Sequence, residues 1–289
     1  MYRRKSMSRK RAPVRRRASF AKRAVRRAVA TVSRSRVRRQ VTRLAETKSA
    51  NFYLADPLSY GNNANGSYNL LSLTPGDPTV DPYGVKIDQG TGEGARIGNQ
   101  IRPVKCRFSG VMWPSPWSAT KNKNPMPMEV CMWIFSVKPG INISTQANFQ
   151  MNVLQKFLQY GNNYQPISGQ IQDIVLPVNQ DVVTLYKKRI FKLGNTAYSN
   201  WDGSGTPNVP NNSFSNNDFS LNRKFSIDFT KYCPKVIRWN DNEIIPTSRG
   251  VYCLTVPYYA NGGLPVDPTG VNQEPMQMNV NMSIKYKDM

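Results

Sequence analysis

Residues 276–287 read MQMNVNMSIKYK, and this stretch decides the fold class. Apolar side chains occupy every even position from Met276 to Tyr286, and polar or charged side chains occupy every odd position. Strict alternation over this length predicts a half-buried β-strand, because successive side chains of a strand point to opposite faces of the sheet.

Five further segments have the composition of strands. They are 104–113, 128–137, 182–193, 224–232 and 251–259. The second, MEVCMWIFSV, is apolar almost throughout and is expected to be a central strand covered on both faces. Helical spacing is seen in the folded part only at Phe149–Leu158, FQMNVLQKFL.

The strand at 104–113 is expected to have two different faces. Alternation places Val104, Cys106 and Phe108 on the buried face. The other face then carries the basic residues Lys105 and Arg107. This strand is therefore predicted to present positive charge on the surface of a sheet.

Six or more strands, one short helix and long loops rich in Gly, Pro and Asn indicate an all-β fold. We expect a single jelly-roll β-sandwich with long loops, because the strand number is even and the connections are long. An immunoglobulin-like sandwich is the alternative, and its usually shorter and more evenly spaced turns fit less well.

Charge is concentrated at one end of the chain. The 289 residues include 40 Lys and Arg, 17 Asp and Glu and no His, for a formal net charge of +23. Residues 1–43 hold 18 of the basic residues and no acidic one, so 22 basic and 17 acidic residues remain for positions 44–289. The basic residues of this arm are Arg3, Arg4, Lys5, Arg9, Lys10, Arg11, Arg15, Arg16, Arg17, Lys22, Arg23, Arg26, Arg27, Arg34, Arg36, Arg38, Arg39 and Arg43.

The basic arm is predicted to be disordered in isolation and to bind nucleic acid. Eighteen like charges repel one another and prevent collapse onto a core. Each phosphate that the arm neutralises releases counterions, which gives strong binding without sequence preference. The clusters Arg3–Lys5, Arg9–Arg11 and Arg15–Arg17 also resemble the basic patches that nuclear import receptors bind, so these nine residues are predicted to serve nuclear localisation as well.

The absence of His excludes the common hydrolase centres, since Ser-His-Asp and Cys-His systems and His-ligated zinc need an imidazole. The four cysteines form no CxxC pair and are expected to be reduced core residues. We predict no catalytic residue, no metal site and no cofactor. No apolar run is long enough to predict a membrane span.

Three segments resemble a known family. They are RIGNQIRPVKCRFSGVMW at Arg96–Trp113, NQDVVTLYKKRIFKL at Asn179–Leu193 and KYCPKVIRWNDNEIIPTSRGVYCLTVPYY at Lys231–Tyr259. Together with the arm they are similar, in the same order, to segments of capsid proteins of circular, replication-initiator-encoding single-stranded DNA viruses, the circovirus-like group. In that family the first segment leads into the first strand of the sandwich.

The resemblance implies a virion protein that assembles with itself into a sixty-copy icosahedral T=1 shell. It also implies import into the host nucleus by host import receptors, packaging of a circular single-stranded DNA genome, and an unidentified cell-surface receptor. We expect three regions: the basic arm at 1–43, an extended leader with loops at 44–95, and the jelly-roll capsid domain at 96–289.

Two other functions fit the same charge and fold. A coat protein of a small single-stranded RNA virus would have the same arm, and a cellular basic nucleic-acid-binding protein would share the charge but carry it across its folded body. Under the capsid interpretation, Lys105, Arg107, Lys187, Lys188 and Arg189 are candidates for an inner surface that contacts the genome. Replacing all five should lower nucleic-acid content without preventing assembly.

Overall fold

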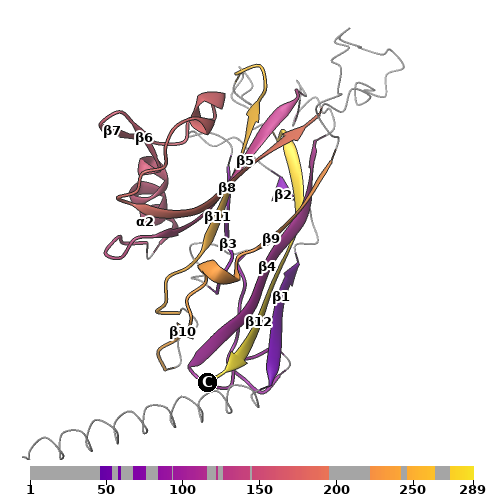
Figure 1. Cartoon of the computed structure of the whole chain (residues 1–289), viewed down its shortest axis with the longest axis vertical. Coiled ribbons are helices and arrows are strands. Elements are labelled where there is room, and N and C mark those ends of the chain that lie inside the picture. Colours follow the sequence, from indigo (N-terminus) through magenta and orange to yellow (C-terminus); the bar gives the residue numbers. More distant parts are fainter. Residues whose placement is uncertain are drawn as a thin grey trace, which may run out of the picture. The chain divides into compact units, whose positions relative to one another are not determined.

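The computed structural model of the chain shows one folded unit, Thr47–Met289, built almost entirely of antiparallel strands (Figure 1). The structure describes residues 46–53, 58–59, 68–75, 84–92, 94–115, 122, 126–143, 145–194, 222–241, 246–263 and 274–289. The basic arm at 1–43 lies outside the described residues, so its expected disorder and its nucleic-acid contacts stay predictions.

One sheet has six strands. Its central path runs β1 (Thr47–Tyr53), β12 (Met276–Asp288), β4 (Gln100–Pro114) and then β9 (Arg223–Asp228). Two short strands extend it, because β10 (Ile237–Arg238) also pairs with β4 and β2 (Leu58–Ser59) pairs with β12. The stretch from Met276 that predicted a strand is thus one of the two central strands of this sheet.

The second sheet has four strands in the order β3 (Asn69–Ser72), β11 (Tyr252–Tyr259), β5 (Met128–Val137) and β8 (Val183–Leu193). Strand β5 pairs with β11 on one side and β8 on the other, so it is central, as its apolar run predicted. Its predicted bounds also agree with the observed ones.

The strand order is that of a jelly roll. The eight main strands follow each other along the chain as β1, β3, β4, β5, β8, β9, β11 and β12. Numbered one to eight, they form sheets of order 1-8-3-6 and 2-7-4-5. Successive strands therefore change sheet at every step except from β5 to β8, which pair in the same sheet, and this is the order of a jelly roll. The order confirms the predicted fold class.

The core lies between the two sheets. The inward residues of β4 and β12, among them Phe108, Met282 and Ile284, pack with Met132 of β5 and Leu71 of β3. These side chains are 0–1 % exposed, so this layer supplies most of the apolar burial that stabilises the sandwich.

A second apolar layer covers the outer face of the four-stranded sheet. Residues 138–182, between β5 and β8, form α2 (Gln146–Asn152), the 3-10 helices η1 (Leu154–Lys156) and η2 (Ile171–Ile174), and the hairpin β6 (Leu158–Tyr160) and β7 (Asn163–Gln165). Phe157 of this insert packs edge-on against Trp133, with ring centroids 5.7 Å apart. Figure 1 shows the insert on one side of this sheet and the six-stranded sheet on the other.

The segment between the 3-10 helix η5 (Thr230–Tyr232) and β11 contains the short strand β10.

Among the described residues no helix is both long and apolar enough to span a membrane. Cys106, Cys131 and Cys253 are fully buried, as expected of core residues, and burial raises the pKa of Cys131 and of Cys253 to about 12.

Four expectations about local structure were wrong. The leader at 44–95 contains β1 and β3, so the folded unit begins at Thr47, and Arg96–Trp113 leads into the third main strand and not the first. The helix α2 begins before Phe149 and ends at Asn152, because the chain then tightens into η1 and turns into β6. Val104 is 46 % exposed, since a bulge leaves it without a partner between Pro103 and Lys105.

Candidate nucleic-acid interface

The outer face of the six-stranded sheet carries a cluster of cations, which we call the basic face. Lys105 of β4 lies opposite Lys285 of β12, and the next outward pair toward the sheet's end is Arg102 and Lys287. Lys224 of β9 lies opposite Val111 on the same face. The basic face is formed by Arg102, Lys105, Arg107, Lys224, Lys285 and Lys287.

The cations of the basic face are accessible. All except the half-buried Lys287 are exposed. The Arg107 guanidinium donates from Nε to the Ser226 hydroxyl at 2.8 Å, which holds this side chain across β4 and β9. The ammonium groups of Lys105 and Lys285 face each other and repel, so an anion bound between them is favoured electrostatically.

Asp228 is the acidic residue of the basic face among the positions that the structure describes. It lies opposite Arg107, and its carboxylate accepts a hydrogen bond from the Thr230 amide at 2.9 Å. The bonds from Thr230 and, to a smaller extent, the charges of Lys105 and Arg107 hold the pKa of Asp228 below its ordinary value. One carboxylate leaves this face strongly positive.

Polar and aromatic residues continue the surface along β12 and β1. Asn281 and Ser283 precede Lys285 and Lys287 on the outward side of β12. Tyr53 of β1 lies opposite Asn281 with 61 % of its surface exposed. Cations that follow a backbone, combined with an exposed aromatic ring for stacking, are typical of surfaces that bind single-stranded nucleic acid.

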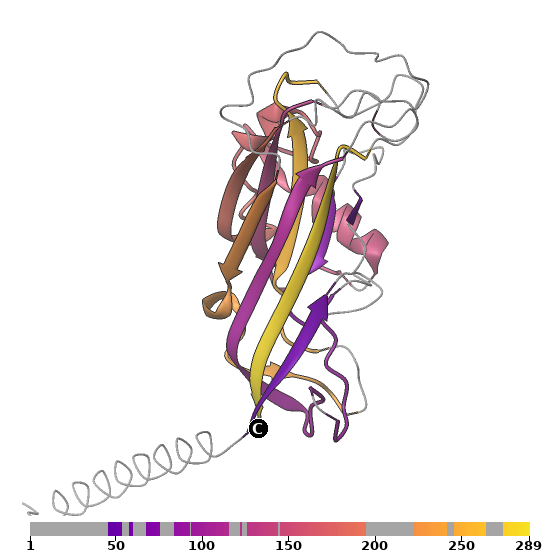
Figure 2. The same cartoon turned by 90° about the vertical axis from the view of Figure 1, so that its right-hand side faces the viewer.

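No element in the described part of the chain packs on the basic face. Figure 2 shows β9, β4, β12 and β1 toward the viewer with no helix crossing them. The outer face of the other sheet differs, because the insert at 138–182 covers it with an apolar layer. The outer face of the four-stranded sheet is thus covered by the insert, whereas the outer face of the six-stranded sheet is open.

The chain enters the folded unit at the basic end of this sheet. Thr47, the first residue of β1, lies opposite Lys287, whose other neighbour is Arg102. Only three residues separate Arg43, the last cation of the arm, from Thr47. The arm is therefore joined by a short segment to the strand whose first residue lies opposite Lys287.

The second predicted cluster lies elsewhere. Lys187, Lys188 and Arg189 belong to β8 of the four-stranded sheet, so the structure does not bring them together with Lys105 and Arg107. Lys188 points toward the insert, where its ammonium donates to the Ile174 carbonyl and lies 5.6 Å from the centre of the Trp133 ring. Lys187 and Arg189 are half-buried on the opposite side of the strand. Within this cluster, Lys188 thus has a structural role in holding the insert.

Sequence reasoning missed four cations of the basic face, namely Arg102, Lys224, Lys285 and Lys287. Alternation does show that Lys224, Lys285 and Lys287 point away from the core, whereas Arg102 does so only because the bulge at Val104 shifts the alternation of β4. The register that places Lys285 beside Lys105 joins segments 180 residues apart, and no local pattern encodes it. No group of three or more possible metal ligands occurs among the described residues.

No protein-family model matches the sequence, and no curated protein matches it. Among solved structures, PNGF-II is 9% identical with a TM-score of 0.36, over 84% of this chain and 35% of that chain. The VP1 protein of Trichodysplasia spinulosa-associated polyomavirus, in complex with 3'-sialyllactose, is 11% identical with a TM-score of 0.25, over 84% of this chain and 96% of that chain. This chain spans about a third of the length of PNGF-II. Both similarities are weak, and the strand order itself assigns the folded unit to the jelly rolls, the architecture of viral capsid domains, lectins and cupins.

Proposed function

We propose that this chain is a viral capsid protein that assembles into a small icosahedral shell and packages a circular single-stranded DNA genome through its basic N-terminal arm. The observation that carries the proposal is the open basic face on one sheet of a jelly roll, with the chain of an eighteen-cation arm entering at its end. Lectins and cupins share the architecture, and nothing in that shared architecture calls for such an arm.

The proposed packaging mechanism is electrostatic. The arm neutralises phosphates wherever it meets them, and counterion release provides the free energy. The basic face would then hold the outermost turns of the packaged strand against the shell, with Lys105 and Lys285 on either side of a phosphate. Because both elements bind the backbone, the shell would accept its genome without reading the sequence.

The proposed orientation follows from the two different sheet surfaces. The open basic face would be directed toward the genome, and the sixty copies would each contribute one such face and one arm. The same clusters within residues 3–17 would serve nuclear import before assembly, when the arm is not yet bound to nucleic acid. Backbone contacts do not separate DNA from RNA, and the resemblance of Arg96–Trp113 and Lys231–Tyr259 to circovirus-like capsid proteins favours DNA.

The proposal is tested by electron microscopy of the purified full-length protein and of a variant that lacks residues 1–43. Absorbance at 260 and 280 nm reports nucleic acid in each preparation. We expect closed, uniform particles from the full-length protein, with nucleic acid lost when the arm is removed. The deletion leaves β1 intact, so it removes the cations without removing a strand.

Treatment of opened particles with DNase or RNase then identifies the nucleic acid. Degradation by DNase alone supports the DNA genome, whereas degradation by RNase alone would favour a coat protein of an RNA virus. A monomer or small oligomer that binds nucleic acid and never closes a shell would overturn the capsid proposal in favour of a cellular nucleic-acid-binding protein.

A further inference from the structure

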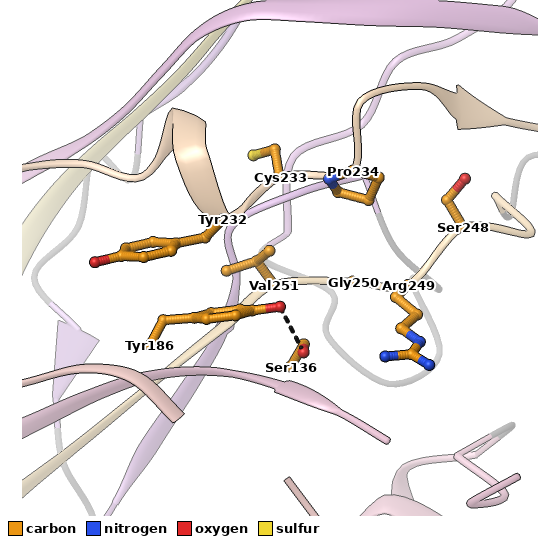
Figure 3. A pocket seen from close by; sticks show the side chains of 9 residues that line it. All are labelled: Ser136, Tyr186, Tyr232, Cys233, Pro234, Ser248, Arg249, Gly250 and Val251. Carbon is orange, nitrogen blue, oxygen red and sulfur yellow. Dashed lines mark hydrogen bonds between the residues drawn. The ribbon is translucent and has the colours of Figure 1, made fainter. Parts of the chain in front are cut away.

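A pocket of about 350 Å³ is lined by residues of β5, β8 and the segments between η5 and β11 (Figure 3). Ser136 and Tyr186 come from the end of β5 and the start of β8. Cys233 and Pro234 follow η5, and the loop before β11 supplies Arg249. Three segments far apart in the sequence therefore build one concave site.

The inner wall of the pocket is rigid. The rings of Tyr186 and Tyr232 stack almost in parallel, with centroids 4.7 Å apart and planes 8° apart. The Tyr186 hydroxyl hydrogen-bonds to the hydroxyl of the buried Ser136 at 2.8 Å, as the dashed line in Figure 3 shows. The wall is thus fixed before any ligand arrives, which lowers the entropic cost of binding.

The chemistry of the pocket selects a flat, mainly apolar body. The Ser136 and Tyr186 hydroxyls already pair with each other, and the Ser248 hydroxyl accepts from the Arg238 amide and donates to the Val236 carbonyl. Pro234 and Val251 add apolar surface. A sugar would need a hydrogen-bond partner for each of its hydroxyls, whereas an aromatic base needs partners only at its edge.

One cation, Arg249, lines the pocket, and two more, Lys231 and Lys235, belong to the segment that adjoins its lining. Arg249 is exposed, and in the view of Figure 3 it lies on the side opposite Tyr232. Lys235, which follows Pro234, is exposed as well. The ammonium of Lys231 lies 4.9 Å from the centre of the Tyr232 ring. A ligand whose flat body enters the pocket would therefore meet positive charge with any anionic group that stays outside.

We infer that this pocket binds one nucleotide with an unpaired base, the base inside against Tyr186 and Pro234 and the phosphate outside on Arg249. A volume of about 350 Å³ exceeds that of a single base and suits a nucleotide. Taking the nucleotide as part of a single strand rests on the proposed function, while a free mononucleotide has the same chemistry. The pocket would hold one base of the strand at a defined point of each subunit, which the backbone contacts of the arm do not provide.

Photo-crosslinking tests the inference on the full-length protein. A short single-stranded oligodeoxynucleotide that carries 5-iodouracil is irradiated with the protein, and the labelled residues are identified by mass spectrometry of the digest. We expect label on Tyr186 or Tyr232. The label on these two tyrosines is expressed as a fraction of all the label on the protein, so that label on the arm does not count as binding to the pocket.

Matched variants make the result specific. Arg249→Gln should lower the fraction of label at Tyr186 and Tyr232 about tenfold, because it removes one charge-assisted hydrogen bond to phosphate. Arg238→Gln makes the same chemical change at an exposed residue outside the pocket lining and should leave that fraction unchanged. Both substitutions are at the surface, and circular dichroism verifies that each variant is folded.

The outcomes separate the two possible sources of the nucleotide and separate this inference from the capsid proposal. Label at the two tyrosines that Arg249→Gln removes supports the inference, whether or not shells form. Label there with the free 5-iodouracil mononucleotide and none with the oligonucleotide would overturn the single-strand assignment. Label confined to the arm or to the basic face would overturn the inference, while closed particles that contain nucleic acid would leave the capsid function standing.

Discussion

At the residue scale, Gly110 shows how closely the strands of the six-stranded sheet approach. A Cβ atom at this position would contact the backbone carbonyl of Asn279 and lie 2.8 Å from the Phe225 ring. The carbonyl belongs to the paired strand β12 and has no room to move without breaking the ladder. We expect Gly110→Ala to lower the free energy of unfolding by about 3 kcal/mol, measured by urea denaturation.

Gly92 provides the control for this substitution, because a Cβ atom there meets nothing within 4 Å. Gly92→Ala should change the unfolding free energy by less than about 0.5 kcal/mol. Equal effects of the two substitutions would contradict the packing argument.

Asp228 gives the basic face a pH dependence. Its pKa is lower in the folded chain than the ordinary value of 3.8, mainly because Thr230 donates to the carboxylate. A lowered pKa stabilises the fold above the ordinary value, and this contribution disappears as the pH falls through the folded value. Wild-type protein should therefore lose more stability below pH 3.8 than Asp228→Asn, as followed by thermal unfolding over a pH series. Parallel profiles for the two proteins would show that the carboxylate contributes nothing.

The cations of the two sheets are expected to respond differently to the same change. Replacing Lys105, Arg107 and Lys285 by Gln should lower the nucleic acid per particle, because it removes half of the six charges of the basic face. Lys188→Gln should leave packaging unchanged and destabilise the fold by about 1–3 kcal/mol, since the Ile174 carbonyl and the Trp133 ring lose their cation. Absorbance ratios of purified particles and thermal unfolding measure the two effects, and a packaging defect in Lys188→Gln would contradict the division.

At the element scale, the strands that the sequence predicted are those with a strong pattern. The bounds of β5 follow from an unbroken apolar run, and β12 follows from alternation that begins at Met276. Strand β1, TKSANFY, has no apolar run, and β3 has only four residues among turn-forming ones, so propensity alone does not separate them from loops. Pairing with β12 and β11 makes them strands, and such pairing is a property of the tertiary fold.

The position of β1 and β3 predicts where the chain tolerates truncation. A variant that starts at residue 47 keeps all eight main strands and should unfold cooperatively at nearly the wild-type temperature. A variant that starts at residue 96 lacks β1 and β3, which leaves β12 and β11 without a neighbour on one side. We expect that shorter variant to be insoluble or rapidly digested in limited proteolysis. Cooperative unfolding of the shorter variant would show that both strands are dispensable.

At the scale of the whole molecule, the arm and the basic face should contribute to binding in proportion to their charges. The logarithm of the affinity for single-stranded DNA falls with the logarithm of salt concentration by roughly 0.7 per phosphate contact. If all eighteen cations of the arm and the six of the basic face contact phosphates, the variant without residues 1–43 keeps six of these contacts. Its plot of log affinity against log salt concentration should then have about a quarter of the slope of the full-length protein. Fluorescence anisotropy over a salt series measures it, and an unchanged slope would show that the arm is not a main binding element.

The central place of β12 also determines when the six-stranded sheet forms. This strand separates β1 from β4, and it leaves the ribosome after every other strand described here. Its partner Thr47 is made about 240 residues earlier than Lys287, and such distant pairing forms slowly. Until β12 is inserted, β1 and β4 each have an unpaired edge that other chains could join. The basic face therefore exists only in a chain whose synthesis has passed β12.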